Sequence, residues 1–385
     1  MKHTLIILAL FAGMFCFGQG AENNTLATKI DKQRLHYADK AILESIKNKE
    51  IPGAVLAVVH YDKIVYLKAY GNKQNDPVAE KMKTNTIFDL ASLTKVVSTA
   101  TSVMILAERG KIRLEDPVSM YLPEFKDEIK IKHLLTHTSG LPSYAPVKLL
   151  ENKQVDQPDV LIQHIAAVKR NSSPGEGFIY SCLNYITLQL IVEKVSGQNL
   201  RDFARGNIYE VLGMKNTDYT PAVKKHKMIA PTEKQADNQI LLGTVHDPIA
   251  RVLKNGISGN AGLFSDAKDL ALFSAMMLNN GTLKGKRVLS PLTVKAMTTV
   301  PCEFSTYGRT FGWDMYSSYA SNQGDLLGPN TYGHTGYTGT SIVIDPDNQI
   351  AIILLTNRVH PEDKGSVTRL RALVANAVAG AVRFE

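Results

Sequence analysis

The chain has 385 residues, of which 44% are hydrophobic and 21% charged, a balance typical of a globular protein with an ample core. The net charge of +8 is spread along the sequence, without a Lys/Arg run or interleaved aromatic residues. This distribution gives little support to nucleic-acid binding, and we expect no nucleic-acid partner.

The first twenty residues have the pattern of an export signal. Met1-Lys2-His3 precedes an apolar run at 5–17, which is too short to span a bilayer comfortably, and small residues follow. We expect residues 1–20 to be a signal peptide and 21–385 to form one exported domain, periplasmic or secreted. A retained anchor is the alternative. No later apolar segment is long enough to be transmembrane, so we expect no stable membrane span after cleavage.

The next segment predicts a helix and a β-hairpin. Apolar residues recur at helical spacing within 31–48, at Leu35, Ala38, Ile42 and Ile46. Residues 54–60 and 63–70 are rich in β-branched and aromatic residues and are separated only by Tyr61-Asp62. Two such runs around a tight turn predict an antiparallel hairpin.

The rest of the chain is helical in its middle and returns to strands near its end. Strand patterns occupy 340–345 and 349–356, and an amphipathic segment follows at 366–382. We therefore expect an α+β fold with an antiparallel sheet formed by both ends of the chain, at about 28–88 and 300–385. Helices flank this sheet, and a large, mostly helical region is inserted at about 89–299.

Ser92 and Lys95 stand at the start of a helical pattern. Three residues are almost one helical turn, so the two side chains share a face. A serine nucleophile needs a base within hydrogen-bond reach, and a lysine whose pKa is lowered by burial can be that base or assist it. The helix start also favours an oxyanion. Taken alone the pair is weak, because a serine that caps a helix gives the same pattern.

Two further candidates follow along the chain. Tyr180 precedes an apolar helix predicted at 185–195, and a tyrosine beside an ammonium group can act as a general base. His334-Thr335-Gly336 precedes the strand at 340–345, where a strand edge would offer the Tyr337 N–H to an oxyanion. The alternative for Tyr180 is a half-buried aromatic side chain without a catalytic role. The alternative for 334–336 is the start of a glycine-rich hairpin.

His133 and His137 have the spacing at which two histidines on one helical face can bind zinc. However, the zinc-protease pattern has a glutamate directly after the first histidine, and here that residue is Leu134. No cysteine or carboxylate cluster adds ligands at a telling spacing. We expect no metal and interpret the two histidines as packing of a helix end.

The candidates together carry a family resemblance. Ser92-x-x-Lys95, Tyr180 and His334-Thr335-Gly336, in this order and at these intervals, resemble the three motifs of serine β-lactamases and penicillin-binding proteins. The similarity is greater to the class-C-like branch, which includes esterases, DD-peptidases and muropeptide amidases. It covers most of the chain from about residue 35. Three further stretches resemble members of this branch: 133–142, 256–265 and 357–361.

The resemblance implies a β-lactamase/transpeptidase-like fold with its site between the sheet and the helical region. It implies that Ser92 is the acylated nucleophile, that Lys95 and Tyr180 transfer protons, and that no cofactor is required. The backbone N–H groups of Ser92 and Tyr337 would form the oxyanion hole. Substrate contacts would come from the second and third motifs, at Cys182, Asn184, His334, Thr335 and Gly336.

Two motif positions depart from the usual pattern of this branch. The second motif usually reads Tyr-x-Asn, but Cys182 stands in the last position, and a thiol is a poor partner for a substrate amide. The third motif more often begins with lysine, whereas the charge of His334 is only partly present at neutral pH. Both changes weaken the case for an efficient β-lactamase. Cys182 as the nucleophile is a rival interpretation, and a small buried thiol is the other.

The sequence therefore predicts an exported serine hydrolase that acts through an acyl-enzyme on amide bonds of peptidoglycan-derived substrates. Relatives that share the Asn-Arg-Val-His-Pro stretch at 357–361 indicate a muropeptide amidase or a DD-carboxypeptidase. The expected partner is a small-molecule or muropeptide substrate. An esterase or weak β-lactamase is the alternative. A non-catalytic, penicillin-binding-like sensor belongs to a different class and is suggested by Cys182 and His334.

Overall fold

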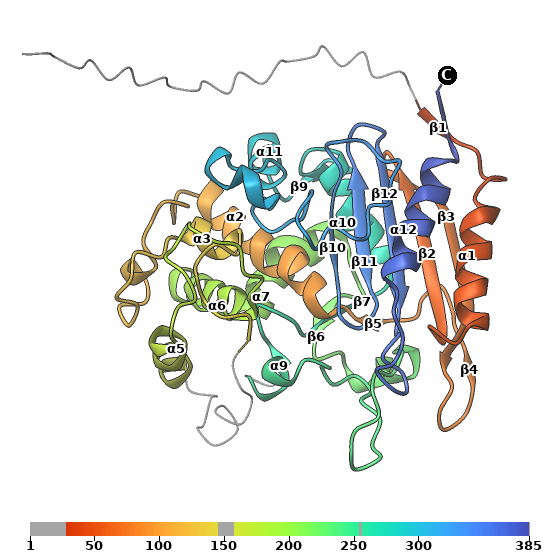
Figure 1. Ribbon diagram of the computed structural model, residues 1–385, viewed down its shortest axis with the longest axis horizontal. Coiled ribbons are helices and arrows are strands. Elements are labelled where there is room, and N and C mark those ends of the chain that lie inside the picture. The colour runs from red at the N-terminus through yellow and green to blue at the C-terminus, as the bar shows by residue number, and fades with distance from the viewer. Residues whose placement is uncertain (1–27, 145–157, 254–255, 385) are drawn as a thin grey trace, which may run out of the picture.

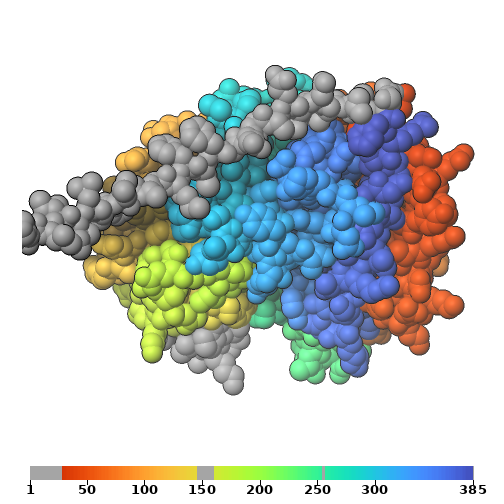
Figure 2. All heavy atoms as spheres, turned by 45° about the horizontal axis from the view of Figure 1, so that its top comes forward, coloured from red at the N-terminus to blue at the C-terminus, as the bar shows by residue number. Residues whose placement is uncertain are grey.

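The computed structural model describes residues 28–144, 158–253 and 256–384. The expected signal peptide at 1–20 and the segment at 145–157 lie outside these ranges. Figure 1 shows a sheet on one side of the molecule and a helical region on the other. In Figure 2 the first and last segments of the chain, red and dark blue, adjoin on one side of the protein.

The main sheet has six strands in the order β10-β11-β12-β2-β3-β4, and each neighbouring pair is antiparallel. The two ends of the chain meet where β12 pairs with β2. This confirms the expected sheet and hairpin, although β3 runs beyond the predicted residue 70. The strands are β2 (Gly53–His60), β3 (Lys63–Gln74), β4 (Glu80–Lys81), β10 (Tyr332–Thr335), β11 (Ser341–Asp345) and β12 (Ile350–Thr356).

The central strands are buried on both faces. Leu56 and Val58 of β2 belong to one cluster with Val374 of α12 (Thr368–Ala379) and with residues of α1 (His36–Lys47). Val55 and Ala57 point the other way, into the main core with α10 (Ala267–Leu278). Because successive side chains alternate between faces, strands covered on both sides read as nearly continuous apolar runs.

The inserted region is helical, as expected, with short irregular pieces between its helices. Its central helix, α6 (Cys182–Ser196), begins three residues before the predicted start and is capped by Ser181, whose Oγ accepts from the Leu183 N–H. The other α-helices between 89 and 299 are α2 (Thr101–Glu108), α3 (Ile131–Leu135), α5 (Pro158–Ala167), α7 (Leu200–Ala204), α8 (Glu210–Leu212), α9 (Pro248–Val252), α10 and α11 (Pro291–Met297).

Several short elements were not predicted from the sequence. A three-stranded sheet within the helical region has the order β5-β7-β6, and its strand β5 leads directly to Ser92. Two-residue and three-residue strands carry too little periodicity to be recognised. They are β1 (Thr28–Ile30), β5 (Phe88–Asp89), β6 (Asp218–Tyr219), β7 (Leu263–Ser265), β8 (Thr282–Leu283), β9 (Lys286–Arg287) and β13 (Val382–Phe384).

The remaining described helical segments are short 3₁₀-helices and π-helices. The 3₁₀ pieces are Ala91–Leu93, Val118–Met120, Val223–Met228 and Cys302–Tyr307, and the π-helical pieces are Lys95–Ala100 and Arg205–Tyr209. Cys182 and Cys302 are both free thiols. Over the described ranges, no helix has both the length and the apolar character needed to cross a membrane.

The packing of β12 generates a stability prediction. Ile353 is fully buried in the main core between β11 and β2, so Ile353→Ala removes apolar contacts and leaves a cavity. We expect the free energy of unfolding, measured with urea, to fall by about 2–5 kcal/mol. Leu292→Ala is the control, because Leu292 is 79% exposed. An equal loss in both variants would contradict this account of the core.

Candidate active site

A cleft of about 360 Å³ lies between the sheet edge and the helical region. Its walls include Ser92 and Tyr180 from the helical side and residues 334–337 from β10 and the turn after it. Three segments that are far apart in sequence therefore meet at one cavity. All three motifs that were singled out from the sequence contribute to it.

Ser92 lies in a tight turn between β5 and the helix that follows. The preceding residue, Ala91, has φ +45°, a strained left-handed conformation for a residue with a side chain. The Asp89 carboxylate holds this turn by accepting from the Ala91 N–H at 2.9 Å. The helix does not start as a regular α-helix. A 3₁₀ turn at Ala91–Leu93 is followed by the π-helical stretch Lys95–Ala100.

Lys95 is buried beneath Ser92 and holds it directly. Its Nζ donates to Ser92 Oγ at 2.9 Å and to the backbone carbonyl of Asn260 at 2.9 Å. Cys182 Sγ is 3.7 Å away from the same nitrogen. The serine–lysine pair expected from the spacing is thus in hydrogen-bond contact.

The charge state of Lys95 differs from the expectation. Burial by itself lowers the pKa of the Lys95 ammonium, but the interactions with Cys182 and Tyr180 raise it more. The pKa of Lys95 therefore lies above its usual value, and the expectation of a lowered pKa was wrong. A protonated lysine cannot accept the serine proton, so Lys95 is suited to stabilising negative charge beside Ser92.

Tyr180 lies directly before α6 and is enclosed by polar and aromatic side chains. The Ser181 N–H donates to Nδ1 of His137 at 3.0 Å, which anchors the segment at the residue after Tyr180. The groups around the Tyr180 ring, with distances to its centroid, are the His137 ring (4.4 Å), the Tyr319 ring (5.0 Å), Lys95 Nζ (5.1 Å), the Arg309 guanidinium (5.7 Å) and the His334 ring (6.1 Å).

The structure contradicts the expected substrate contact of Asn184. This side chain is fully buried, where it donates to Nδ1 of His137 at 3.1 Å and accepts from the Ser139 hydroxyl at 2.5 Å. Two residues along an α-helix correspond to a rotation of about 200°, so Asn184 points away from Cys182. Asn184 supports His137 instead of contacting substrate.

Cys182 lies beside Lys95 and is half-buried. Neither Cys182 nor Asn184 is among the described residues that line this cleft. Burial raises the pKa of the Cys182 thiol, although the nearby Lys95 charge lowers it in part. A thiol that stays protonated is a poor nucleophile, so these observations favour Ser92 over the rival Cys182.

His334 is a buried, neutral residue of β10. It is 4% exposed, and its Nδ1 donates to the Thr335 carbonyl at 2.9 Å, while its Nε2 has no hydrogen-bond partner among the described residues. Burial lowers the pKa of His334 well below its usual value, and the charges of Arg309 and Lys95 lower it further. The imidazole therefore supplies no positive charge at neutral pH.

Gly336 is the point at which the third motif meets the nucleophile segment. A side chain at this position would collide with the Leu90 carbonyl and the Thr340 side chain, so only glycine allows the approach. The Thr340 hydroxyl donates to the Leu90 carbonyl at 3.0 Å, and the Thr338 hydroxyl to that of Asp89 at 2.8 Å. Ser92 and Tyr337 consequently face the same cleft, and their oxyanion hole stays a prediction.

His133 and His137 accept hydrogen bonds from different segments of the backbone. His133 Nδ1 accepts from the Lys130 N–H at 3.2 Å, and His137 Nδ1 accepts from the Ser181 N–H. In the described part of the chain, no three His, Cys, Asp or Glu residues form a group that could hold a metal ion. The interpretation as packing missed one consequence, because His137 also stacks on Tyr180.

Sequence reasoning also missed the arginines of the cleft. Arg309, Arg358 and Arg371 all contribute to its lining. Arg309 forms a buried ion pair with Asp314 at 2.9 Å, and Arg371 donates to the carbonyls of Gly336 and Thr340 at 2.8 and 2.9 Å. Arg358 falls in the stretch at 357–361 and Arg371 in the amphipathic segment at 366–382, but neither pattern singles out an arginine.

The fold and the site together define a class of enzyme, the serine hydrolases built on the β-lactamase/transpeptidase-like fold. A solved class C β-lactamase has a similar fold, with a TM-score of 0.71 at 20% identity over 91% of this chain and 99% of that one. Residues 38–376 match the family model described as Beta-lactamase. The chain belongs to the β-lactamase family.

Two curated relatives are similar over nearly their whole length. The chain is 32% identical over 414 residues to an N-acetylmuramyl-L-alanine amidase of Bacillus subtilis (strain 168), which covers 94% of this chain and 92% of the relative. It is also 32% identical over 405 residues, with the same coverage, to a protein of Escherichia coli (strain K12) named "Putative D-alanyl-D-alanine carboxypeptidase". These relatives and the family confirm the expectation of a serine hydrolase.

The contact between Lys95 and Ser92 generates the first activity prediction. Ser92→Ala removes the hydroxyl on which the covalent route depends, so we expect turnover to be lost while the fold, measured by circular dichroism, is kept. Ser366→Ala removes a hydroxyl from the same cleft and should keep turnover. Lys95→Ala and Tyr180→Phe should each lower kcat by orders of magnitude, without adding to the loss in Ser92→Ala. Near-normal turnover by folded Ser92→Ala would refute the assignment.

The neutral state of His334 generates a pH prediction. Because its pKa is lowered, the imidazole does not change charge between pH 6 and pH 8, and KM for a carboxylate-bearing substrate should be flat there if His334 is the contact. A KM that rises through about pH 6.5, the usual pKa of histidine, would contradict this.

His334→Lys tests the same position by adding a permanent charge. It should raise the rate of acylation by β-lactams relative to that by neutral esters. His36→Lys adds the same charge on the exposed side of α1 and should leave this ratio unchanged. An unchanged ratio in His334→Lys as well would mean that residue 334 does not set specificity.

Proposed function

We propose that this protein is an exported serine hydrolase that acts through an acyl-enzyme on amide bonds of peptidoglycan-derived substrates. The observation that carries the proposal is the 2.9 Å contact between Lys95 Nζ and Ser92 Oγ at a cleft that Tyr180 also lines. The names of the two relatives, an amidase and a DD-carboxypeptidase, support the substrate class. Export is supported by the signal-like pattern at 1–20.

In the proposed reaction, Ser92 Oγ attacks the carbonyl carbon of the amide while its proton passes to the phenolate of Tyr180. Lys95 remains an ammonium and stabilises the negative charge that develops on Oγ and on the phenolate. When the C–N bond breaks, Tyr180 gives the proton to the leaving amine. Water then attacks the Ser92 ester, again losing a proton to Tyr180, and Ser92 recovers its hydroxyl.

The lining of the cleft fits a peptide-like substrate with anionic groups. Arg358 and Arg371 stand on the same wall as the third motif. Burial and the neighbouring Arg358 lower the pKa of Arg371 to about 9, so it still carries its charge at neutral pH. Tyr319 is 51% exposed and lies over Tyr180, where it offers an apolar face at the opening of the cleft.

An esterase is the second candidate, because two motif positions are poorly suited to an amide substrate. His334 is neutral, and the thiol of Cys182 is a poor partner for an amide, so neither offers the contact that the usual lysine and asparagine would make. An ester needs less help at these positions, since its leaving group does not have to be protonated before it departs.

The two candidates are separated by supplying purified protein with a MurNAc-peptide, a D-Ala-D-Ala peptide and a short p-nitrophenyl ester. We expect release of an amine product from one of the first two and a transient acyl adduct detected by intact mass. Ser92→Ala is the control and should form no adduct. Turnover of the ester alone would overturn the cell-wall proposal. Export is tested separately, by the cellular fraction and N-terminal sequence of the expressed full chain.

A further inference from the structure

Arg309 and Asp314 form an ion pair that is buried in the wall of the cleft. Arg309 is 1% exposed and Asp314 2%, and Nη1 of the arginine lies 2.9 Å from Oδ2 of the aspartate. Both residues line the cavity that contains Ser92. Buried ion pairs seldom add stability, because removing two charges from water costs about as much as their attraction returns. The position of this pair beside the reacting groups therefore calls for a functional explanation.

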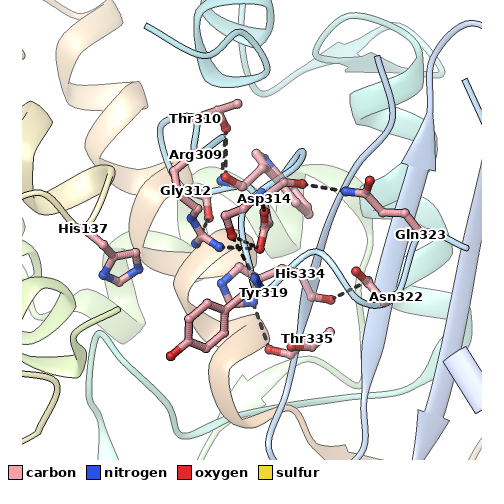
Figure 3. A network of polar contacts seen from close by, with 12 residues as sticks. His137, Arg309, Thr310, Gly312, Asp314, Tyr319, Asn322, Gln323, His334 and Thr335 are labelled. Carbon is pink, nitrogen blue, oxygen red and sulfur yellow. Dashed lines mark hydrogen bonds and ion pairs between the residues drawn. The ribbon is translucent and has the colours of Figure 1, made fainter. Parts of the chain in front are cut away.

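The pair is attached to the strand that carries the third motif. The backbone of Asp314 exchanges two hydrogen bonds with that of Gly333, at 3.0 and 2.8 Å. Its carboxylate also accepts from the N–H and hydroxyl of Ser317, and Arg309 Nη2 donates to the Gly312 carbonyl at 3.3 Å. Figure 3 shows the guanidinium directed toward His334 and Tyr319. Arg309 is thus held at a defined place next to β10.

From this place the guanidinium reaches the ring of Tyr180. Its central carbon is 5.7 Å from the ring centroid, and Nε has no hydrogen-bond partner among the described residues. The other side chains that face Tyr180 come from five different parts of the chain. The titratable and aromatic groups are Lys95, His137, Tyr185, Tyr319 and His334.

Of the groups around Tyr180, the two histidines are neutral. Burial lowers the pKa of His137 and of His334 well below the usual value, and the Arg309 charge lowers both further. The positive charges near the ring, among the described residues, are therefore those of Lys95 and Arg309. Lys95 approaches from the nucleophile side at 5.1 Å and Arg309 from the β10 side at 5.7 Å.

We propose that Arg309 is a positioning residue for Tyr180 and supplies the permanent positive charge that the third motif lacks. It stabilises the phenolate that accepts the Ser92 proton, and it neither donates nor accepts a proton itself. Asp314 holds the guanidinium in place and moderates its charge. This inference rests on the proposed acyl transfer by Ser92. The positive charge that a lysine would supply at position 334 comes instead from Arg309, on the loop before β10.

The test measures the rate at which a serine-directed fluorophosphonate modifies Ser92, by intact mass, from pH 5 to pH 10. Arg309→Gln removes a positive charge beside Tyr180, which accepts the Ser92 proton in the proposed reaction. We expect the rise of the rate with pH to move upward by about one unit, with an about tenfold slower reaction at pH 7. Arg309→Lys keeps the charge and should return the profile toward that of the wild type.

Asp314→Asn gives an independent test with the opposite sign. It removes a negative charge and leaves the guanidinium, so the rise of the rate should move to lower pH. A purely structural role for the pair would slow both variants without moving either profile. Arg309→Gln leaves buried Asp314 without its cation, so the folding of each variant is checked by circular dichroism. If Arg309→Gln is unfolded, the pH profiles of Asp314→Asn and Arg309→Lys test the inference in its place.

A second arginine offers a matched control. Arg170 pairs with Asp127 at 2.6 Å, and its guanidinium lies 5.7 Å from the centroid of the Phe125 ring. Arg170→Gln therefore removes a similar pair outside the cleft, and its pH profile should equal that of the wild type. If the wild type forms the adduct but folded Arg309→Gln has the same dependence of rate on pH, this inference is overturned and the proposed function is not. A wild type that forms no adduct would overturn the proposed function and this inference with it.

Discussion

The buried ammonium group of Lys95 is the constraint on which the site depends. A charge removed from water is costly unless polar groups surround it, and the chain places Ser92 Oγ, the Asn260 carbonyl and the Cys182 thiol around this nitrogen. These groups come from three separate segments, so satisfying one charge also assembles the site. Asn260 contributes a backbone carbonyl, so no side chain in the sequence marks this contact.

The second constraint is the close contact between Gly336 and the segment before Ser92. The Thr338 and Thr340 hydroxyls bond to successive carbonyls at Asp89 and Leu90, so the sheet edge and the nucleophile turn are joined by short polar contacts. Arg371 of α12 binds the carbonyls of Gly336 and Thr340 from the other side. A helix near the end of the described chain thereby supports the wall opposite Ser92.

Local patterns predicted the hairpin at 54–70 and the serine–lysine contact, because each depends on neighbours in sequence. Features that depend on distant segments were missed or wrong. The pKa of Lys95 is raised by Cys182 and Tyr180, whose proximity no local pattern reveals. Asn184 was assigned to the cleft by its distance in sequence, but the helix turns it toward His137. Arg309 lies in an irregular loop, and only the pairing of Asp314 with Gly333 brings it to the site.

The distribution of charge separates two tasks that one lysine of the third motif would otherwise combine. With a neutral His334 on β10, contact with substrate at this position depends on shape and hydrogen bonding instead of charge. Positive charge at the cleft comes instead from Lys95 and from arginines on other segments, each held by its own partners. In the proposed reaction, the positive charge beside the nucleophile therefore does not depend on the residue at the third motif.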